Sequence, residues 1–181
     1  MQKKKIFVEI EIPPQARKRL IQKIEQWKNL PVKWMKEANL HVTLAFLGYV
    51  DESVLPEICQ KVASAAMRHE SFDLEFEKIT LGPNPEDPQM FWLEGSVSNE
   101  LKALSESIEK ELGIFRTEHK SFRPHITLGR IRTLKWDALK NKPLVEEKAK
   151  LVFSVENVLV MESSQEKGVA GYNVLESCPL Q

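Results

Sequence analysis

Two six-residue stretches, HVTLAF (41–46) and HITLGR (125–130), share the same His-x-Thr-Leu frame. With four histidines and five threonines among 181 residues, chance would produce only about 0.1 His-x-Thr occurrences in the chain. Alternate side chains of a β-strand point to the same face, so the His and Thr of each copy lie together, opposite their apolar neighbours. Each copy therefore predicts a strand that is anchored in a core and presents an imidazole and a hydroxyl group.

The segments before the two copies correspond as well. Residues 5–12 (KIFVEIEI) alternate as a half-buried strand, and apolar residues at helical spacing follow the proline pair 13–14. Before the second copy, a strand precedes a helix that is expected from a cap at Ser98 or Asn99 to a stop at Gly113. The order strand, helix, His-x-Thr strand thus occurs once in each half, which predicts a duplication about a pseudo-twofold axis.

The remaining strands follow one another without intervening helices. Residues 72–81 and 89–97, joined by the turn-rich stretch 82–88, predict a hairpin, and residues 150–162 and 171–177 predict two last strands. This order favours an α+β fold with antiparallel sheets over a doubly wound parallel fold. The length suits one compact domain, or two small lobes that share a core.

The composition limits the classes of partner. Lys plus Arg and Asp plus Glu both count 26, so any contact with nucleic acid has to be local. Glu9 and Glu11 interrupt the apolar positions that follow the basic start, and no apolar stretch approaches the length of a membrane span. Cys59 and Cys178 lack metal-type spacing and fit a reduced compartment. We therefore expect a cytoplasmic protein that contacts no membrane, with a monomer as the default state.

Two convergent His-x-Thr strands would suit the chemistry of a phosphodiester. One neutral imidazole takes a proton from an attacking water while the other, protonated, gives one to the departing oxygen. The hydroxyls of Thr43 and Thr127 can donate to the non-bridging oxygens of the phosphate. Such a site needs no metal, no cofactor and no covalent intermediate. A strained cyclic phosphodiester of ribose would suit it, and an RNA end with a 2',3'-cyclic phosphate is the partner that we expect.

The charge near the second copy agrees with this partner. Glu118 is the one acidic residue between positions 116 and 135, and the net charge of that stretch is about +5. Its basic residues are Arg116, Lys120, Arg123, Arg130, Arg132 and Lys135.

The stretches NLHVTLAFLG (39–48) and FRPHITLGR (122–130) resemble the paired motifs of the two-histidine phosphoesterases, specifically the bacterial and archaeal RNA 2',3'-cyclic phosphodiesterases. The opening IFVEIEIPP (6–14) and the length are also similar. The resemblance implies a single domain over residues 1–181, with two lobes that each contribute one His-x-Thr strand and antiparallel sheets that line a central cleft. It also implies hydrolysis of the cyclic phosphate to a 2'-phosphate end.

Carried over to this chain, the resemblance makes His41 the acid that protonates the leaving 3'-oxygen and His125 the base that activates water. It assigns phosphate binding to Thr43, Thr127 and Arg130, and stacking on the terminal base to Phe46. Phe46 and Arg130 both lie five residues after their histidine, an odd offset that a regular strand would send to the opposite face. A bulge or strand end must therefore intervene, and Gly129 permits one.

Other interpretations of the same residues remain open. Zinc is an alternative for paired histidines, although neither motif supplies a third ligand. In a regular strand Phe46 would lie on the same apolar face as Leu44, so it is also a candidate core residue. The chain could act as a 2'-5' RNA ligase or on another small cyclic or 2',5'-linked phosphodiester. Outside the enzyme class, it could bind RNA ends or nucleotides without turning them over.

Overall fold

Two antiparallel β-sheets form the framework of the protein. The computed structural model describes residues 2–114, 124–166 and 169–181. The four-stranded sheet has the strand order β3-β1-β8-β9, and the five-stranded sheet has the order β2-β6-β5-β4-β7. The strands are β1 (Lys3–Glu11), β2 (Val32–Trp34), β3 (His41–Asp51), β4 (Phe72–Pro83), β5 (Pro88–Gly95), β6 (His125–Ile131), β7 (Glu146–Val155), β8 (Asn157–Glu166) and β9 (Val169–Pro179). Helices and antiparallel sheets together confirm the predicted α+β class.

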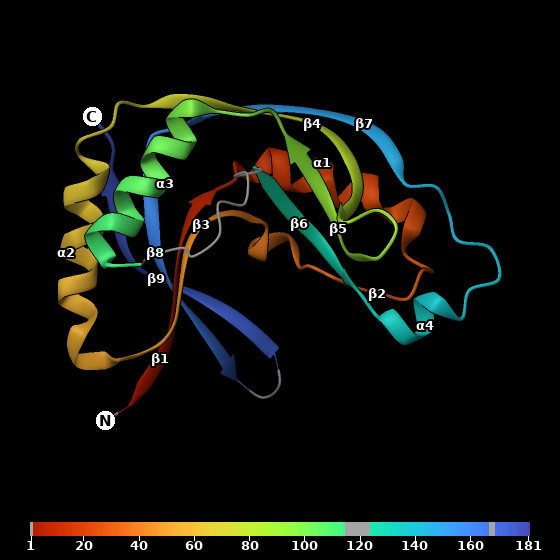
Figure 1. Cartoon of the computed structure of the whole chain (residues 1–181), viewed down its shortest axis with the longest axis horizontal. Coiled ribbons are helices and arrows are strands. Elements are labelled where there is room, and N and C mark those ends of the chain that lie inside the picture. Colours follow the sequence, from red (N-terminus) through yellow and green to blue (C-terminus); the bar gives the residue numbers. More distant parts are fainter. Residues whose placement is uncertain (1, 115–123, 167–168) are drawn as a thin grey trace.

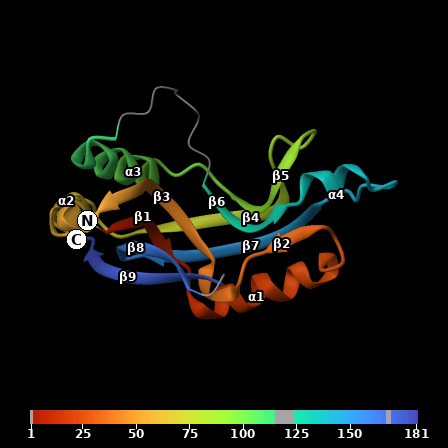
Figure 2. The same ribbon diagram turned by 90° about the horizontal axis from the view of Figure 1, so that it is seen from below.

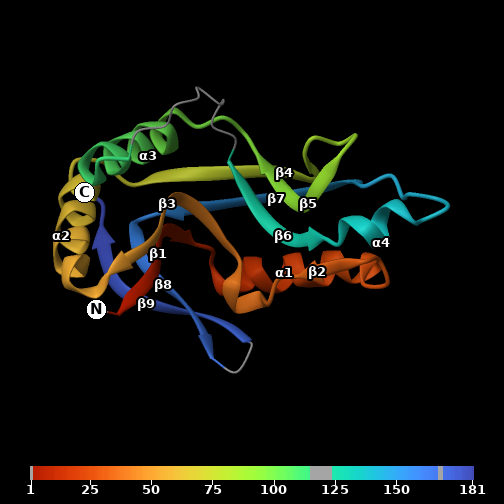
Figure 3. The same ribbon diagram turned by 60° about the horizontal axis from the view of Figure 1, so that its bottom comes forward.

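Two helices cover the four-stranded sheet. These are α2 (Leu55–Ala66) and α3 (Asn99–Leu112), which lie side by side at one end of the molecule (Figures 1 and 3). The limits of α3 are those that the sequence predicts. The Ser98 hydroxyl accepts a hydrogen bond from the Leu101 N–H at 3.1 Å, and Gly113 ends the helix with a left-handed φ of 68°.

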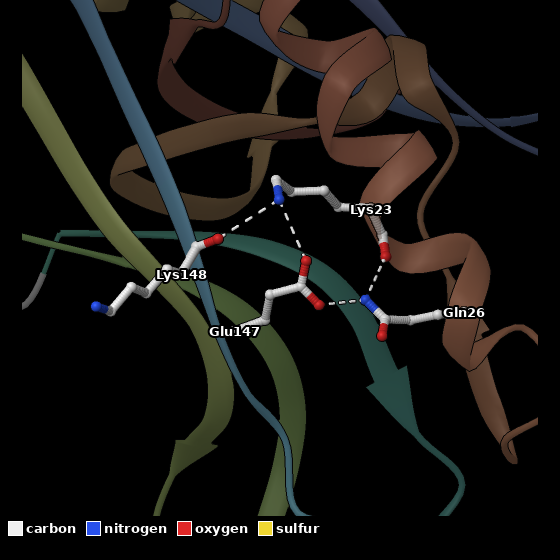
Figure 4. Close-up of polar contacts among 4 residues, drawn as sticks. All are labelled: Lys23, Gln26, Glu147 and Lys148. Carbon is white, nitrogen blue, oxygen red and sulfur yellow. Dashed lines mark hydrogen bonds and ion pairs between the residues drawn. The ribbon is translucent and has the colours of Figure 1, made fainter.

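Helix α1 (Pro14–Ile24) packs on the five-stranded sheet, as Figure 2 shows. Trp27, in the short turn after α1, places its ring 5.7 Å from that of Phe91 on β5. A polar cluster ties the same helix to β7 (Figure 4): Lys23 contacts Glu147 at 3.2 Å, and Gln26 donates to the other oxygen of that carboxylate. Strand β1 therefore belongs to the four-stranded sheet, whereas α1, which follows β1 in the sequence, packs on the five-stranded sheet.

One cluster of buried side chains extends across both sheets. One face of β1 contributes to this cluster through Ile6, Val8 and Ile10, which are buried. A smaller cluster lies on the opposite face of β1, where Phe7 packs with Leu159, Met161 and Tyr172. Strand β1 is thus apolar on both faces near its centre, which the alternation alone did not predict.

One local prediction differs from the structure. The stretch 150–162 was expected to be one strand, but the chain leaves the sheet at Glu156, so that β7 joins the five-stranded sheet and β8 the four-stranded one. Hydrophobic alternation is the same in both strands and does not reveal which sheet each one joins. No side chain caps α2, because a 3-10 turn precedes it. A short helix, α4 (Thr133–Asp137), follows β6 and buries Trp136.

The predicted duplication is visible in the sheet pairing. In one half β1 pairs antiparallel with β3, and in the other half β5 pairs antiparallel with β6. His41 lies opposite Glu11 and His125 lies opposite Glu94, so the two histidines occupy equivalent positions in their strand pairs.

Candidate active site

A β-bulge interrupts β3 within the first His-x-Thr motif. Glu9 pairs with Thr43 and Val8 pairs with Ala45, so that Leu44 has no partner in the register. The extra residue shifts the alternation by one position. Phe46 consequently pairs with Phe7, whose ring lies 5.3 Å from the His41 imidazole. Because cross-strand partners share a face, His41, Thr43 and Phe46 all lie on the same side of the sheet.

An equivalent bulge interrupts β6. Trp92 pairs with Thr127 and Phe91 with Gly129, and Leu128 is left out of the register. Arg130 then pairs with Met90. The Thr127 hydroxyl donates to the Met90 sulfur at 3.6 Å, so Thr127 and Arg130 share a face as well. The break in each strand that the odd offset required is thus observed at the Leu of both motifs.

The bulged residues keep their backbone carbonyls satisfied. Ser105 on α3, itself buried, donates to the Leu44 carbonyl at 3.1 Å. The Met35 N–H donates to the Leu128 carbonyl at 2.9 Å. Buried carbonyls without partners are costly, so these bonds stabilise both bulges.

Strand β2 links the two motifs. It pairs with β6, Val32 opposite Ile131 and Trp34 opposite Gly129, only seven residues before His41. Gly129 is needed for this approach, since a Cβ atom there would lie 2.5 Å from Val32. Its φ is not positive, so its role is to admit β2 rather than to permit the bulge. The chain therefore passes from a strand that is hydrogen-bonded to β6 into β3 through one short 3-10 turn, Glu37–Asn39.

The His41 imidazole is held at both nitrogens. Its Nδ1–H donates to the Asn39 carbonyl at 2.7 Å, and its Nε2 lies 3.0 Å from the Thr43 hydroxyl. In the neutral ring, Nε2 is then the acceptor, and it is the nitrogen beside the exposed Thr43. Phe7 and Tyr172 pack against the ring at 5.3 and 5.7 Å between centroids.

Burial lowers the pKa of His41 below its ordinary value of 6.5, partly offset by the Asn39 carbonyl, and the positive charges of His125 and Arg130 lower it further. His125 and Arg130 are therefore close enough to His41 for their charges to act on it. The structure brings together the two predicted histidines and Arg130 from opposite halves of the chain.

A carboxyl group lies behind His41. Glu9 is 6% exposed, and its Oε2 atom lies 3.5 Å from His41 Nδ1. That oxygen has no hydrogen-bond partner among the described residues. Burial, together with the charge of Glu11, raises the pKa of Glu9 to about 8 against the opposing effect of Arg17. At neutral pH both Glu9 and His41 are thus mainly uncharged in the free protein.

An indole ring lies beside His125. The rings of Trp92 and His125 are 4.5 Å apart between centroids. Trp92 is buried and lies over Gly82, where a Cβ atom would overlap it at 2.0 Å. The His125 ring therefore rests on a rigid aromatic surface.

Phe46 is a surface residue, which excludes the interpretation that places it in the core. The residue is 58% exposed, and the Lys5 ammonium lies 5.4 Å from the centroid of its ring. It also lines a groove of about 500 Å³ between β3 and α2. Arg130 is exposed at the corresponding position of β6.

The sequence prediction missed four neighbours of the histidines: Phe7, Glu9, Trp92 and Tyr172. Phe7 could have been recognised from the sequence, because it is a large apolar residue on the otherwise polar face of residues 5–12. Tyr172 could not have been recognised in this way, since the tertiary fold alone brings β9 next to this site. Of the predicted basic stretch, Arg116, Lys120 and Arg123 lie outside the described residues.

Two properties of the described residues concern metal ions and membranes. Within residues 2–114, 124–166 and 169–181, no group of three or more His, Cys, Asp or Glu side chains could hold a metal ion. No helix in the described part of the chain is long and apolar enough to cross a membrane.

The fold has two antiparallel sheets, with one His-x-Thr motif on a strand of each. The sequence matches the 2'-5' RNA ligase superfamily over residues 12–167, and the chain belongs to that superfamily. The RNA 2',3'-cyclic phosphodiesterase of Thermotoga maritima is 31% identical over 139 residues, 74% of each chain. That of Archaeoglobus fulgidus is 30% identical over 71% of this chain and 73% of that protein. The family resemblance drawn from the motifs is confirmed.

Another relative of the same name, from Aeropyrum pernix, is 35% identical over 57% of this chain, and the match spans only 59% of that protein. Among solved structures, a Thermus thermophilus protein matches with a TM-score of 0.80 at 22% identity, over 97% of both chains. Escherichia coli LigT complexed with 3'-AMP matches with a TM-score of 0.78 at 22% identity, over 99% of both chains. These similarities establish the fold.

Proposed function

We propose that this protein hydrolyses the 2',3'-cyclic phosphodiester at the end of an RNA to a 2'-phosphomonoester. The names of the relatives support the reaction class. The observation that carries the proposal for this chain is the pair of matching bulges. Each bulge puts a histidine, a threonine and the residue at the fifth position on one face, and the charges of His125 and Arg130 act on His41.

The proposed reaction is an in-line displacement with two proton transfers. His125 takes a proton from water, whose oxygen attacks phosphorus, while the bond from phosphorus to the 3'-oxygen breaks. The 3'-oxygen receives the proton from Nε2 of His41. The products are a 2'-phosphate and a free 3'-hydroxyl group, and solvent returns His41 and His125 to their starting protonation states.

The bound phosphate favours the protonation of His41, the proposed acid. Burial keeps His41 neutral in the free protein, but a phosphodiester anion beside Nε2 favours the protonated ring. The hydroxyls of Thr43 and Thr127 donate to the non-bridging oxygens, and Arg130 adds a positive charge. The exposed Phe46 ring offers a surface on which the terminal base stacks.

The test uses an oligonucleotide that ends in a 2',3'-cyclic phosphate, with the products identified by phosphorus NMR. We expect a 2'-phosphate end, full turnover in EDTA, and a bell-shaped dependence of rate on pH. A 3'-phosphate product would contradict the assigned leaving group, and loss of activity in EDTA would contradict the metal-independent mechanism. Binding without any product after long incubation would indicate an RNA-end binding protein.

The ligase alternative is tested with the same protein. An RNA with a 2',3'-cyclic phosphate end is incubated with a second RNA that has a 5'-hydroxyl group, and longer products are sought by gel electrophoresis. We expect hydrolysis to dominate. Accumulation of a 2'-5'-linked product at the expense of the 2'-phosphate would favour ligation instead.

Three broader features belong to the same proposal. We expect residues 1–181 to behave as one domain with two lobes, to act as a monomer, and to work in the cytoplasm. Sedimentation of the purified protein checks the oligomeric state, and a single cooperative unfolding transition checks the domain.

A further inference from the structure

The carboxyl group of Glu9 lies next to the His41 imidazole. Its Oε2 atom is buried, lies 3.5 Å from His41 Nδ1 and has no hydrogen-bond partner among the described residues. A buried polar oxygen is costly to leave unpaired, so its retention needs an explanation. His41 supplies one, because the Nδ1 edge of its ring faces this oxygen while the Nε2 edge faces the exposed Thr43.

The second half of the molecule has a different residue at this position. Glu9 pairs with Thr43 across the first bulge, and Trp92 pairs with Thr127 across the second. The duplicated backbone therefore places a carboxyl group next to one histidine and an indole ring next to the other. The Trp92 ring is tilted by 45° to the His125 ring and carries no net charge, whereas the Glu9 side chain can carry a negative one.

We propose that Glu9 is a positioning residue whose carboxylate stabilises the protonated imidazole of His41 and so makes His41 the proton donor. This inference rests on the proposed function. In the free protein both groups are uncharged. When the Glu9 carboxyl releases its proton to solvent and His41 Nε2 gains one, the pair becomes a carboxylate and an imidazolium with no change in total charge. Nδ1–H keeps its hydrogen bond to the Asn39 carbonyl with the Glu9 carboxylate 3.5 Å from Nδ1, and the Nε2 proton is available to the leaving oxygen.

The two groups therefore titrate as a pair, and the higher of their two apparent pKa values belongs to both. A bound phosphodiester anion next to Nε2 favours the charged form of the pair, because it is closer to the imidazolium than to the carboxylate. Other charged or titratable groups also act on the pair. They are Glu11 on β1, Arg17 on α1, Tyr172 on β9, and His125 and Arg130 on β6.

The test compares Glu9→Gln with Glu11→Gln. The first change keeps the shape of the side chain and removes its charge. The second removes the neighbouring carboxylate of the same strand, which is exposed and contacts Arg17 at 3.4 Å. The rate is measured from pH 5 to pH 9 on the oligonucleotide with a cyclic phosphate end. The pKa of His41 is measured by histidine NMR, with and without inorganic phosphate.

In Glu9→Gln we expect the alkaline limb of the kcat profile to move down by about one to three pH units, because the stabilising charge is gone. At pH 8 kcat should fall at least about tenfold, with KM changing less than about twofold. The NMR titration of His41 should move down in the same direction. Glu9→Asp, which restores a carboxylate, should recover part of the shift, and Glu11→Gln, which removes a weaker and exposed charge, should shift the profile less than Glu9→Gln does.

The proposal is overturned if Glu9→Gln and Glu11→Gln give the same pH profile and the same His41 titration. Circular dichroism at each pH separates a change in titration from a change in folding. If the wild-type protein does not hydrolyse the cyclic phosphate, the proposed function fails. The NMR arm still decides whether Glu9 stabilises protonated His41, because it needs no turnover.

Discussion

The strand pairs β1–β3 and β5–β6 share a backbone plan but differ in the residues that flank their histidines. Both pairs carry a bulge at the Leu of His-x-Thr-Leu, and both place a histidine opposite a glutamate. At the position opposite the Thr, the first pair has Glu9 and the second has Trp92. The comparison indicates that the duplicated backbone sets where the imidazoles point, while the flanking side chains give the two histidines different environments.

The largest expected effect comes from removing either imidazole. His41→Ala and His125→Ala should each lower kcat by on the order of 10² to 10⁴, because each removes a group that transfers a proton. His41→Ala should abolish the alkaline limb of the pH profile and His125→Ala the acid limb. The measurement is kcat against pH on the cyclic phosphate substrate. Full activity in either variant, or loss of the opposite limb, would contradict the roles assigned to the two strands.

Glu9 should also make stability depend on pH. Its pKa is about 8 in the folded protein against an ordinary value of 4.5, so the folded chain binds more protons between these values. The free energy of unfolding should then fall as the pH rises through this window, by up to about 5 kcal/mol. Urea unfolding from pH 4.5 to 8.5 checks this. Glu9→Gln should remove most of the fall, whereas Glu11→Gln should reduce it only in part, because burial is the larger cause of the raised pKa of Glu9.

Substitutions of the two threonines should differ in their effect on the pH dependence of the rate. Thr43→Val and Thr127→Val should each lower kcat about 10²-fold, as expected for a lost hydrogen bond to the developing charge. The Thr43 hydroxyl lies 3.0 Å from Nε2 of His41, and the Thr127 hydroxyl donates to the Met90 sulfur. Thr43→Val should therefore also shift the titration of His41. Equal pH profiles for the two variants would show that the Thr43 contact has no role in proton transfer.

The residue after each bulge should respond differently to a methyl group. Gly129→Ala should destabilise the protein by about 1–3 kcal/mol, because the new Cβ atom would overlap Val32 of β2. The equivalent residue of the first pair is already Ala45, and Ala45→Gly should cost less than about 1 kcal/mol. Thermal unfolding of both variants checks this. A neutral Gly129→Ala would mean that β2 moves aside without cost.

The smallest effects are expected at the fifth position of each motif. Phe46→Ala and Arg130→Ala should each raise KM about tenfold, with little change in kcat, since both act on substrate binding. Only the Arg130 contribution is a charge interaction, so it should weaken as the salt concentration rises. KM is measured at low and high salt. Equal salt dependence in wild type and Arg130→Ala would exclude a phosphate contact by Arg130.

Much of the local structure could be predicted from the sequence. The alternation of residues 5–12 predicts β1, and Ser98 and Gly113 predict both ends of α3, because caps and periodicity depend on neighbouring residues alone. The odd offset of Phe46 and Arg130 even predicted a break in each strand. The division of residues 150–162 between two sheets could not be predicted, since both strands alternate alike and only distant partners decide the sheet.

The candidate site divides in the same way. His41, Thr43, His125 and Thr127 were identified because one frame occurs twice in a chain with few histidines. Glu9 was not, although the prediction placed it on the correct face of its strand. An alternating pattern does not distinguish a carboxylate in water from one buried at 6% exposure beside an imidazole. That difference depends on the tertiary fold, in which β3 and its His41 lie beside Glu9 although they are far from it in the sequence.

The sequence by itself determined the family of this protein, the class of its fold and the residues on which we base its chemistry, because motif spacing and side-chain alternation are local properties of the chain. Tertiary structure alone decided how the two motifs are related. It supplied the bulges at Leu44 and Leu128, the strand β2 that joins one motif to the other, and the burial that makes Glu9 and His41 a coupled pair. These features follow from the pairing and desolvation of distant segments, which arise only when the chain is folded.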